Sequence, residues 1–140
     1  MEELTKNNIG NITELECILA FTKMGYQVSL PYGGQARYDF IAEKNGKFLR
    51  IQVKTSTDKE DYLEFSCTNS HYVKGHHIHT KYSSDEIDYF ATTCRGQCFI
   101  VPVTECSAGK RLRFTIPRNN QTKGISFAKD YTLEEVSKIL

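Results

Sequence analysis

Three side chains in the first half of the chain have the types and spacing to act together on a phosphate ester. Asp39 stands thirteen residues before Gln52, and Lys54 follows two positions later. A carboxylate and an amide carbonyl are hard oxygen ligands that suit Mg²⁺, which keeps several of its waters. A lysine beside them can orient an attacking water and stabilise developing negative charge. These residue types suit hydrolysis of a phosphodiester bond, provided that the fold brings them together.

A predicted β-hairpin brings the three side chains onto one face. Asn45-Gly46 is a strong signal for a two-residue turn, here between predicted strands at 38–44 and 47–54. With this turn, Asp39 lies directly opposite Gln52, with Cβ atoms about 5 Å apart. The lysine, two residues further along the second strand, shares that face because side chains alternate along a strand.

The opposite face of the hairpin supports the same register. It is apolar, as expected for a strand pair that packs on a hydrophobic core. A slip of one residue would bury the polar side chains and expose the apolar ones. The apolar residues are Tyr38, Phe40, Ala42, Leu49, Ile51 and Val53.

A helix predicted at Asn11–Met24 supplies a second carboxylate. Gly25 follows it, and a residue able to adopt positive φ is the expected terminator. With about 3.6 residues per turn, Glu14 falls on the inward side, where a carboxylate needs a metal ion or a lysine as partner. Alternatively, Glu14 closes a capping box with Asn11. The other residues of the predicted inward side are Leu15, Ile18, Leu19 and Phe21.

Three short segments resemble the PD-(D/E)XK nuclease superfamily: residues 10–14 (Gly-Asn-Ile-Thr-Glu), 38–39 (Tyr-Asp) and 52–54 (Gln-Val-Lys). They resemble in particular the branch that holds group I intron homing endonucleases, and Holliday junction resolvases are similar in layout. The resemblance is strongest over about residues 9–56 and continues more loosely to residue 131. It implies an α/β protein of restriction-endonuclease-like fold, with a central mixed β-sheet flanked by helices, and a metal-dependent nuclease activity.

The resemblance also implies a role for each site residue. Glu14 corresponds to the helix glutamate, Asp39 to the metal-binding aspartate and Lys54 to the catalytic lysine. Tyr38 replaces the proline of the motif, where the backbone rather than the side chain matters. Gln52 replaces the acidic residue of the motif and removes one negative charge. Members of the homing-endonuclease branch also have glutamine at this position. The implied metal ligands are Asp39, Gln52 and Glu14, with Mg²⁺ as the cofactor and Mn²⁺ as a substitute.

Polar and basic residues elsewhere are candidates for contacting DNA. Residues 91–123 hold six Lys or Arg residues and a single acidic residue, a balance that suits phosphate, although such clusters are commonly solvated surface. The run at 118–123 could hydrogen-bond phosphates or base edges, or be an ordinary loop. The predicted DNA-contacting residues are Gln35, Arg37, Arg113, Arg118, Asn119, Asn120 and Lys123.

Two further groups of residues are interpreted conservatively. A long polar loop is predicted to hold His71, His76, His77 and His79, which contact DNA or have no specific role, since no nearby cysteine or carboxylate completes a zinc set. Asp88 begins an apolar strand, so a structural hydrogen bond is predicted for it rather than a catalytic role. A last helix is predicted from Thr132, which fits a capping box with Glu135.

The whole-chain properties agree with an intracellular globular enzyme. At 140 residues, with 39% hydrophobic and 25% charged residues, the chain is predicted to form one domain spanning residues 1–140. Its apolar runs are far shorter than the roughly 18 residues that cross a bilayer, so no membrane association and a cytoplasmic location are expected. An odd number of cysteines, five, indicates reduced thiols.

The sequence therefore predicts a metal-dependent DNA endonuclease. A Holliday junction resolvase-like enzyme that cuts branched DNA, and a catalytically inactive DNA-binding module of the same fold, remain as alternatives, the latter because of Gln52. DNA is the predicted partner. A homo-oligomer, dimer or tetramer, is also predicted, since the two antiparallel strands of a duplex call for two sites related by a two-fold axis.

Overall fold

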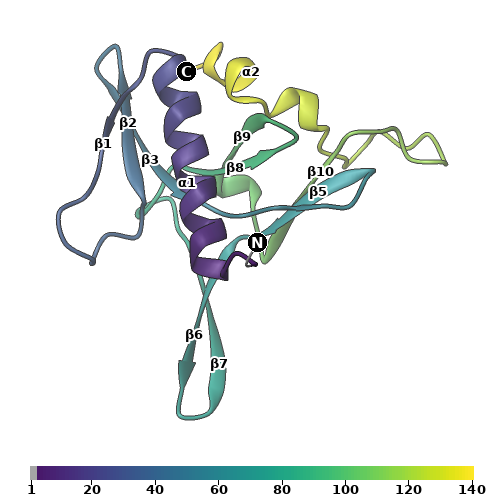
Figure 1. The fold of residues 1–140 in the computed structure, drawn as a ribbon. Coiled ribbons are helices and arrows are strands. Elements are labelled where there is room, and N and C mark those ends of the chain that lie inside the picture. The colour runs from purple at the N-terminus through teal and green to yellow at the C-terminus, as the bar shows by residue number, and fades with distance from the viewer. Residues whose placement is uncertain (1–2) are drawn as a thin grey trace.

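A mixed five-stranded sheet forms the centre of the computed structural model, which describes residues 3–140 (Figure 1). Its strand order is β1-β2-β3-β8-β9, in which only β3 and β8 run parallel. The α/β architecture predicted from the sequence is confirmed. The strands are β1 (Gln27–Ser29), β2 (Phe40–Lys44), β3 (Lys47–Val53), β8 (Tyr89–Cys94) and β9 (Gln97–Pro102).

The remaining elements cover the two faces of this sheet or project from it. Helix α1 (Lys6–Lys23) lies across one face, and a smaller sheet of order β10-β5-β4 packs near the other (Figure 1). Neither helix within residues 3–140 is long and apolar enough to cross a membrane. The smaller elements are β4 (Thr57–Asp58), β5 (Tyr62–Ser66), β6 (Thr68–Val73), β7 (His76–Lys81), β10 (Gly109–Arg113), the 3₁₀ turns Val103–Glu105 and Ala128–Asp130, and α2 (Leu133–Ser137).

Alternating side chains of the central sheet build two hydrophobic clusters. In β8, Phe90 belongs to the cluster that includes β5 and β10, whereas Ala91 belongs to the cluster under α1. In β9, Phe99 and Ile100 divide in the same way. This period of two is what a sheet buried on both faces requires.

The β2–β3 hairpin has the predicted register. Asn45 and Gly46 have φ values of 54° and 78°, as a type I′ turn demands, and Lys44 pairs with Lys47. Most of the predicted apolar face packs into the cluster under α1. Tyr38 differs, because it packs against the cluster on the opposite side of the sheet. The strand itself begins at Phe40, two residues later than predicted.

Helix α1 starts earlier than predicted and turns a different face inward. Thr5 is the N-cap and its hydroxyl accepts from the Asn8 N–H at 3.2 Å, so Asn11 lies inside the helix and the alternative capping box with Glu14 is wrong. Gly25, with φ of 91°, follows the helix end as expected. The buried positions are Thr13, Cys17 and Phe21. The predicted burial of Leu15 and Leu19 is wrong, since they are 66% and 54% exposed.

Two predictions for the rest of the chain have opposite outcomes. The Thr132 hydroxyl caps α2 by accepting from the Glu135 N–H at 3.2 Å, as the sequence indicated. The histidine-containing segment, in contrast, is not a loop but the antiparallel hairpin β6–β7. Its turn at Lys74-Gly75 uses positive φ at both residues, and a lysine in that position gave no turn signal in the sequence.

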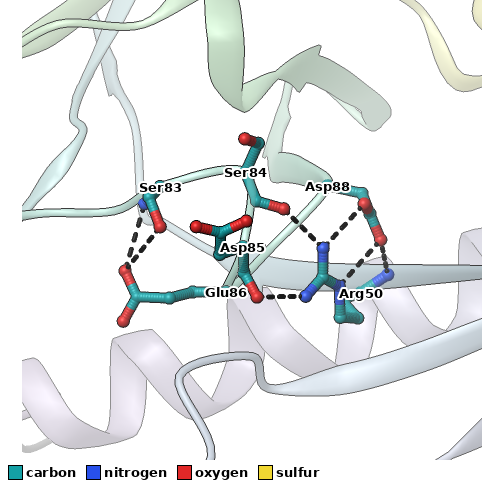
Figure 2. A network of polar contacts seen from close by, with 6 residues as sticks. All are labelled: Arg50, Ser83, Ser84, Asp85, Glu86 and Asp88. Carbon is teal, nitrogen blue, oxygen red and sulfur yellow. Dashed lines mark hydrogen bonds and ion pairs between the residues drawn. The ribbon is translucent and has the colours of Figure 1, made fainter.

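An ion pair between Arg50 and Asp88, called here the Arg50–Asp88 clasp, joins β3 to the residue that precedes β8 (Figure 2). The Asp88 carboxylate accepts from the Arg50 backbone N–H at 2.7 Å and from its guanidinium at 3.0 and 3.1 Å. The same guanidinium donates to the carbonyls of Ser84 and Asp85. The structural role predicted for Asp88 is thereby confirmed. Burial alone would raise the pKa of Asp88, but the bonds and charge of Arg50 outweigh it and hold the pKa below its usual value.

We expect Asp88→Asn to lower the free energy of unfolding at pH 7 by about 1–2 kcal/mol, because charge-assisted bonds to Arg50 are lost. A carboxyl whose pKa is lowered by folding contributes stability above its unfolded-state pKa, and loses it as pH falls through the folded-state pKa. The difference between the two proteins should therefore shrink in acid. Urea denaturation across this pH range measures it, with Asp85→Asn as the control because only the Asp85 carbonyl contacts Arg50. An equal loss in both variants would contradict the role of the clasp.

Candidate active site

Three of the four predicted catalytic side chains line one polar hollow of about 470 Å³. Glu14 reaches it from α1, Asp39 from the segment before β2, and Gln52 from β3. The first turns of α1 and the residues after β3 complete its wall. The other lining residues are Lys6, Asn7, Gly10, Asn11, Val53 and Thr55.

Asp39 is oriented by backbone groups at the point where the β2–β3 ladder ends. Its N–H donates to the Ile51 carbonyl at 2.7 Å, and its Oδ2 accepts from the Val53 N–H at 2.7 Å. The regular pairing stops at Phe40, so the expected direct pairing of Asp39 with Gln52 is replaced by this side-chain bond. Within residues 3–140, Oδ1 accepts no hydrogen bond and is available to a ligand.

The Asp39 carboxylate is held in a partly desolvated place. Burial raises its pKa, and this outweighs the opposing effects of the Val53 N–H and the charge of Lys54. The pKa of Glu14 is also raised, first by burial and then by the negative charge of Asp39. A bound cation is stabilising next to partly buried carboxylates whose ionised forms are disfavoured by burial and by a neighbouring negative charge.

Gln52 contributes a neutral oxygen to the same hollow. Its amide nitrogen donates to the Val53 carbonyl at 3.4 Å, a long bond, and none of the hydrogen bonds formed by the described residues uses its carbonyl oxygen. The donor set of the hollow is therefore two carboxylates and one amide. It fits Mg²⁺, which takes few protein oxygens and keeps its waters. In the part of the chain from residue 3 onward, no three His, Cys, Asp or Glu side chains cluster closely enough for an all-protein metal site.

Lys54 lies next to the hollow rather than in its wall. Its N–H continues the pairing with β8 by donating to the Ala91 carbonyl at 2.9 Å, and its Nζ donates to the Thr68 carbonyl at 2.9 Å. Burial lowers its pKa, while the charge of Asp39 opposes that effect. The ammonium thus interacts electrostatically with Asp39 although its direct bond is to the start of β6.

Tyr82 lies beside the site and was not predicted from the sequence. Its ring lies 5.1 Å from the Lys54 Nζ and 4.2 Å from the Arg37 guanidinium carbon, so two cations contact one aromatic ring. Arg37, predicted to contact DNA, is also paired with Glu86 at 3.3 Å. Gln35, on the loop before it, is exposed and has no such partner among the described residues.

A pair of threonines fixes the helix to the exit of β3. The Thr13 hydroxyl donates to the Ile9 carbonyl at 3.0 Å and lies 3.1 Å from the Thr55 hydroxyl. Thr13 is buried and stands next to Glu14 on α1. Neither threonine was predicted from the sequence, although a threonine on the inward side of a helix is a usable signal.

The remaining predicted DNA-contacting residues are not gathered at the hollow. Figure 1 shows the polar run at 118–123 in a loop at the outer edge of the molecule, far from the N-terminal turns of α1. The Asn119 side chain stabilises a local turn by accepting a hydrogen bond from the Gln121 N–H at 3.0 Å. Arg113 donates to the Thr115 carbonyl at 3.0 Å. Arg118, Asn120 and Lys123 are exposed in the same region.

The mixed sheet, with α1 across one face, has the layout of a restriction-endonuclease-like fold. Residues 4–134 match the sequence profile of the PD-(D/E)XK endonuclease family, and the chain belongs to that family. The predicted family resemblance is confirmed. The fold superposes on that of the bacterial homing endonuclease I-Ssp6803I with a TM-score of 0.78, covering 98% of this chain and 94% of the other. Their sequences are 20% identical, so this likeness concerns the fold.

Part of the chain also resembles a phage protein. Protein 5.3 of Escherichia phage T7 is 42% identical over 48 residues, which make up 34% of this chain and 41% of the phage protein. The matched stretch is therefore less than half of that relative.

We expect Glu14→Gln to raise the melting temperature of the metal-free protein by a few degrees at pH 8, because it removes the cost of partly burying a charged carboxylate and its repulsion with Asp39. A carboxyl whose pKa is raised by folding costs stability above its folded-state pKa, and this cost disappears below its unfolded-state pKa. The gain should therefore vanish near pH 3. Thermal denaturation in EDTA tests this, with Glu16→Gln as the control, an exposed helix glutamate outside the hollow whose carboxylate accepts one long bond, from the Thr93 hydroxyl at 3.4 Å. A loss of stability in Glu14→Gln at pH 8 would show that the carboxylate is structural.

Proposed function

We propose that the protein is a Mg²⁺-dependent endodeoxyribonuclease that hydrolyses phosphodiester bonds of DNA. The observation that carries the proposal is the hollow in which the free Asp39 Oδ1, the Glu14 carboxylate and the Gln52 amide meet. A backbone N–H fixes the Asp39 carboxylate from one side, so its other oxygen is oriented before any ligand arrives. Such orientation reduces the reorganisation that catalysis would otherwise require.

Each residue has a distinct role in the proposed mechanism. Asp39, Gln52 and Glu14 would hold Mg²⁺, which supplies Lewis acidity toward a phosphate oxygen and lowers the pKa of a water. Lys54 stabilises the charge that builds up on the phosphate oxygens and orients the attacking water. Its bond to the Thr68 carbonyl and its contact with Tyr82 keep the ammonium beside Asp39.

Gln52 is the residue that keeps open the alternative of a catalytically inactive DNA-binding module. A neutral amide in place of a carboxylate weakens the attraction for a cation but keeps an oxygen ligand. Glu14, Asp39 and Lys54 all retain the groups that the chemistry needs, and two of them line the same hollow as the amide. This retention favours an active enzyme.

The proposed working form is a symmetric homo-oligomer. One site of this kind cuts one strand, and a two-fold axis presents equivalent sites to the two antiparallel strands of a duplex. A module of this size buries only about 600–1,000 Å² on DNA, so a second subunit raises affinity and specificity.

Asp39→Ala should abolish cleavage of plasmid DNA in Mg²⁺ while leaving DNA affinity within a few-fold of wild type, because a proposed metal ligand is lost. The substitution also removes the acceptor of the Val53 N–H, so thermal denaturation is measured alongside to establish that the variant is folded. Plasmid, linear duplex and a four-way junction, each with Mg²⁺ or EDTA, are the substrates, and preference for the junction would identify a resolvase-like enzyme. Asp85→Ala is the control, an exposed carboxylate outside the hollow. Undiminished Mg²⁺-dependent cutting by Asp39→Ala would disprove the assignment.

Gln52→Glu should lower the Mg²⁺ concentration needed for half-maximal cutting, since it adds a negative charge beside two carboxylates. Gln52→Ala should raise that concentration. Single-turnover cleavage measured across a Mg²⁺ titration gives both values. If neither substitution moves the titration curve, Gln52 is not a ligand.

Light scattering during size-exclusion chromatography should give a mass of at least two chains, with or without DNA. A protein that stays a monomer in both conditions and still makes double-strand breaks would exclude the symmetric form, because one site would then cut the two strands in succession.

A further inference from the structure

The hairpin β6–β7 projects from the body of the protein without packing on it (Figure 1). Of its fourteen positions, residues 68–81, all are exposed except the two threonines Thr68 and Thr80 near its base. The segment contains two lysines, Lys74 and Lys81, and four histidines, but no Asp or Glu. An exposed ribbon that lacks acidic residues suits a polyanion better than it suits a mixed protein surface.

Both ends of the hairpin are tied to residues beside the hollow. The Thr68 carbonyl accepts from the Lys54 Nζ at 2.9 Å, and the Lys81 carbonyl accepts from the Arg37 guanidinium at 3.4 Å. Both donors also contact the ring of Tyr82, the residue that follows the hairpin. The base of the ribbon is therefore held at a fixed place relative to the proposed catalytic lysine.

The ribbon also has internal reasons to keep its shape. Six cross-strand pairs join its two strands, and Lys74-Gly75 forms the tight turn, with φ of 47° and 81°. Next to the turn, the rings of Tyr72 and His77 meet edge to face with centroids 4.6 Å apart. A preorganised ribbon loses little conformational entropy when it binds.

We propose that this hairpin is a DNA-binding arm that enters a groove of the duplex beside the phosphate to be cut. The proposal rests on the nuclease function proposed above. A two-stranded ribbon fits the B-DNA major groove, which is about 12 Å wide. Six residues per strand at about 3.3 Å each give a reach of about 20 Å, or about six base pairs. Lys74 at the tip then meets a phosphate, and the histidines present ring N–H and N atoms to base edges.

The decisive variant shortens the arm and keeps its base. Replacing residues 70–79 by Asn-Gly leaves the Asn69–Thr80 pair next to a favourable two-residue turn, and retains the Thr68 and Lys81 carbonyls that Lys54 and Arg37 bind. Affinity for a fluorescent duplex is measured by anisotropy in EDTA. Cutting is measured in Mg²⁺ under single-turnover conditions at saturating DNA, and contacts are mapped by hydroxyl-radical footprinting.

We expect the shortened protein to bind duplex DNA at least about tenfold more weakly, because one or two contacts to base edges are lost. Its cutting rate at saturation should stay within a few-fold of wild type, and protection should disappear from about six base pairs on one side of the cut. Unchanged affinity and an unchanged footprint would contradict the proposal that the hairpin binds DNA. A lost cutting rate with unchanged affinity would also contradict it and would indicate a catalytic role for the hairpin instead. Wild-type protein that neither binds nor cuts DNA would instead refute the nuclease function.

A point variant covers the case in which the shortened protein does not fold. Lys74→Asn removes the charge at the tip and keeps a residue that tolerates positive φ. It should weaken binding and reduce the salt dependence of binding by about one phosphate contact. The matched control is Lys47→Asn, which removes an exposed lysine beside the turn of the β2–β3 hairpin and should change neither quantity. Equal effects of the two substitutions would contradict the proposed arm.

Discussion

The double pairing of β3 is the constraint on which the site depends. One edge of this strand pairs antiparallel with β2 and the other pairs parallel with β8. The Asn45-Gly46 turn fixes the first register, and the Arg50–Asp88 clasp holds β3 at the point where β8 begins. With both edges fixed, the positions of the side chains at the end of β3 follow. A shift of one residue along either edge would turn Gln52 and its neighbours to the other face.

The end of β3 is also where the electrostatic conflict of the molecule is concentrated. Glu14 and Asp39 are partly buried carboxylates whose pKa values are raised first by burial. The charge of Asp39 raises the pKa of Glu14 further, and the charge of Lys54 opposes the rise for Asp39. In contrast, the partly buried carboxylate of Asp88 is paired with Arg50. Such an electrostatic conflict at one hollow is consistent with the proposed cation site, and it is expected to lower the stability of the metal-free protein.

Much of this arrangement could be predicted from local sequence. The Asn-Gly turn and the alternation of apolar residues predicted the hairpin, its register and its buried face. Both signals depend only on neighbours within a few residues. Gly25 predicted the end of α1 and Thr132 predicted the start of α2, because helix-terminating and capping signals are also local. The hairpin register pointed to Asp39 and Gln52, and the expected inward side of the first helix pointed to Glu14; all three line the hollow.

Other features depended on contacts between distant segments. The rotation of α1 was misjudged because Leu15 and Leu19 are as apolar as core residues, and only the packing of Cys17 and Phe21 on the sheet shows which side is buried. The bend that makes the Asp39 side chain bond to the Val53 N–H breaks a ladder that local rules would have continued. Local sequence therefore determined the hairpin and the chemistry available to it. Tertiary structure alone decided where Lys54 points, because its partners, the start of β6 and Tyr82, come from a segment whose hairpin has no sequence signal.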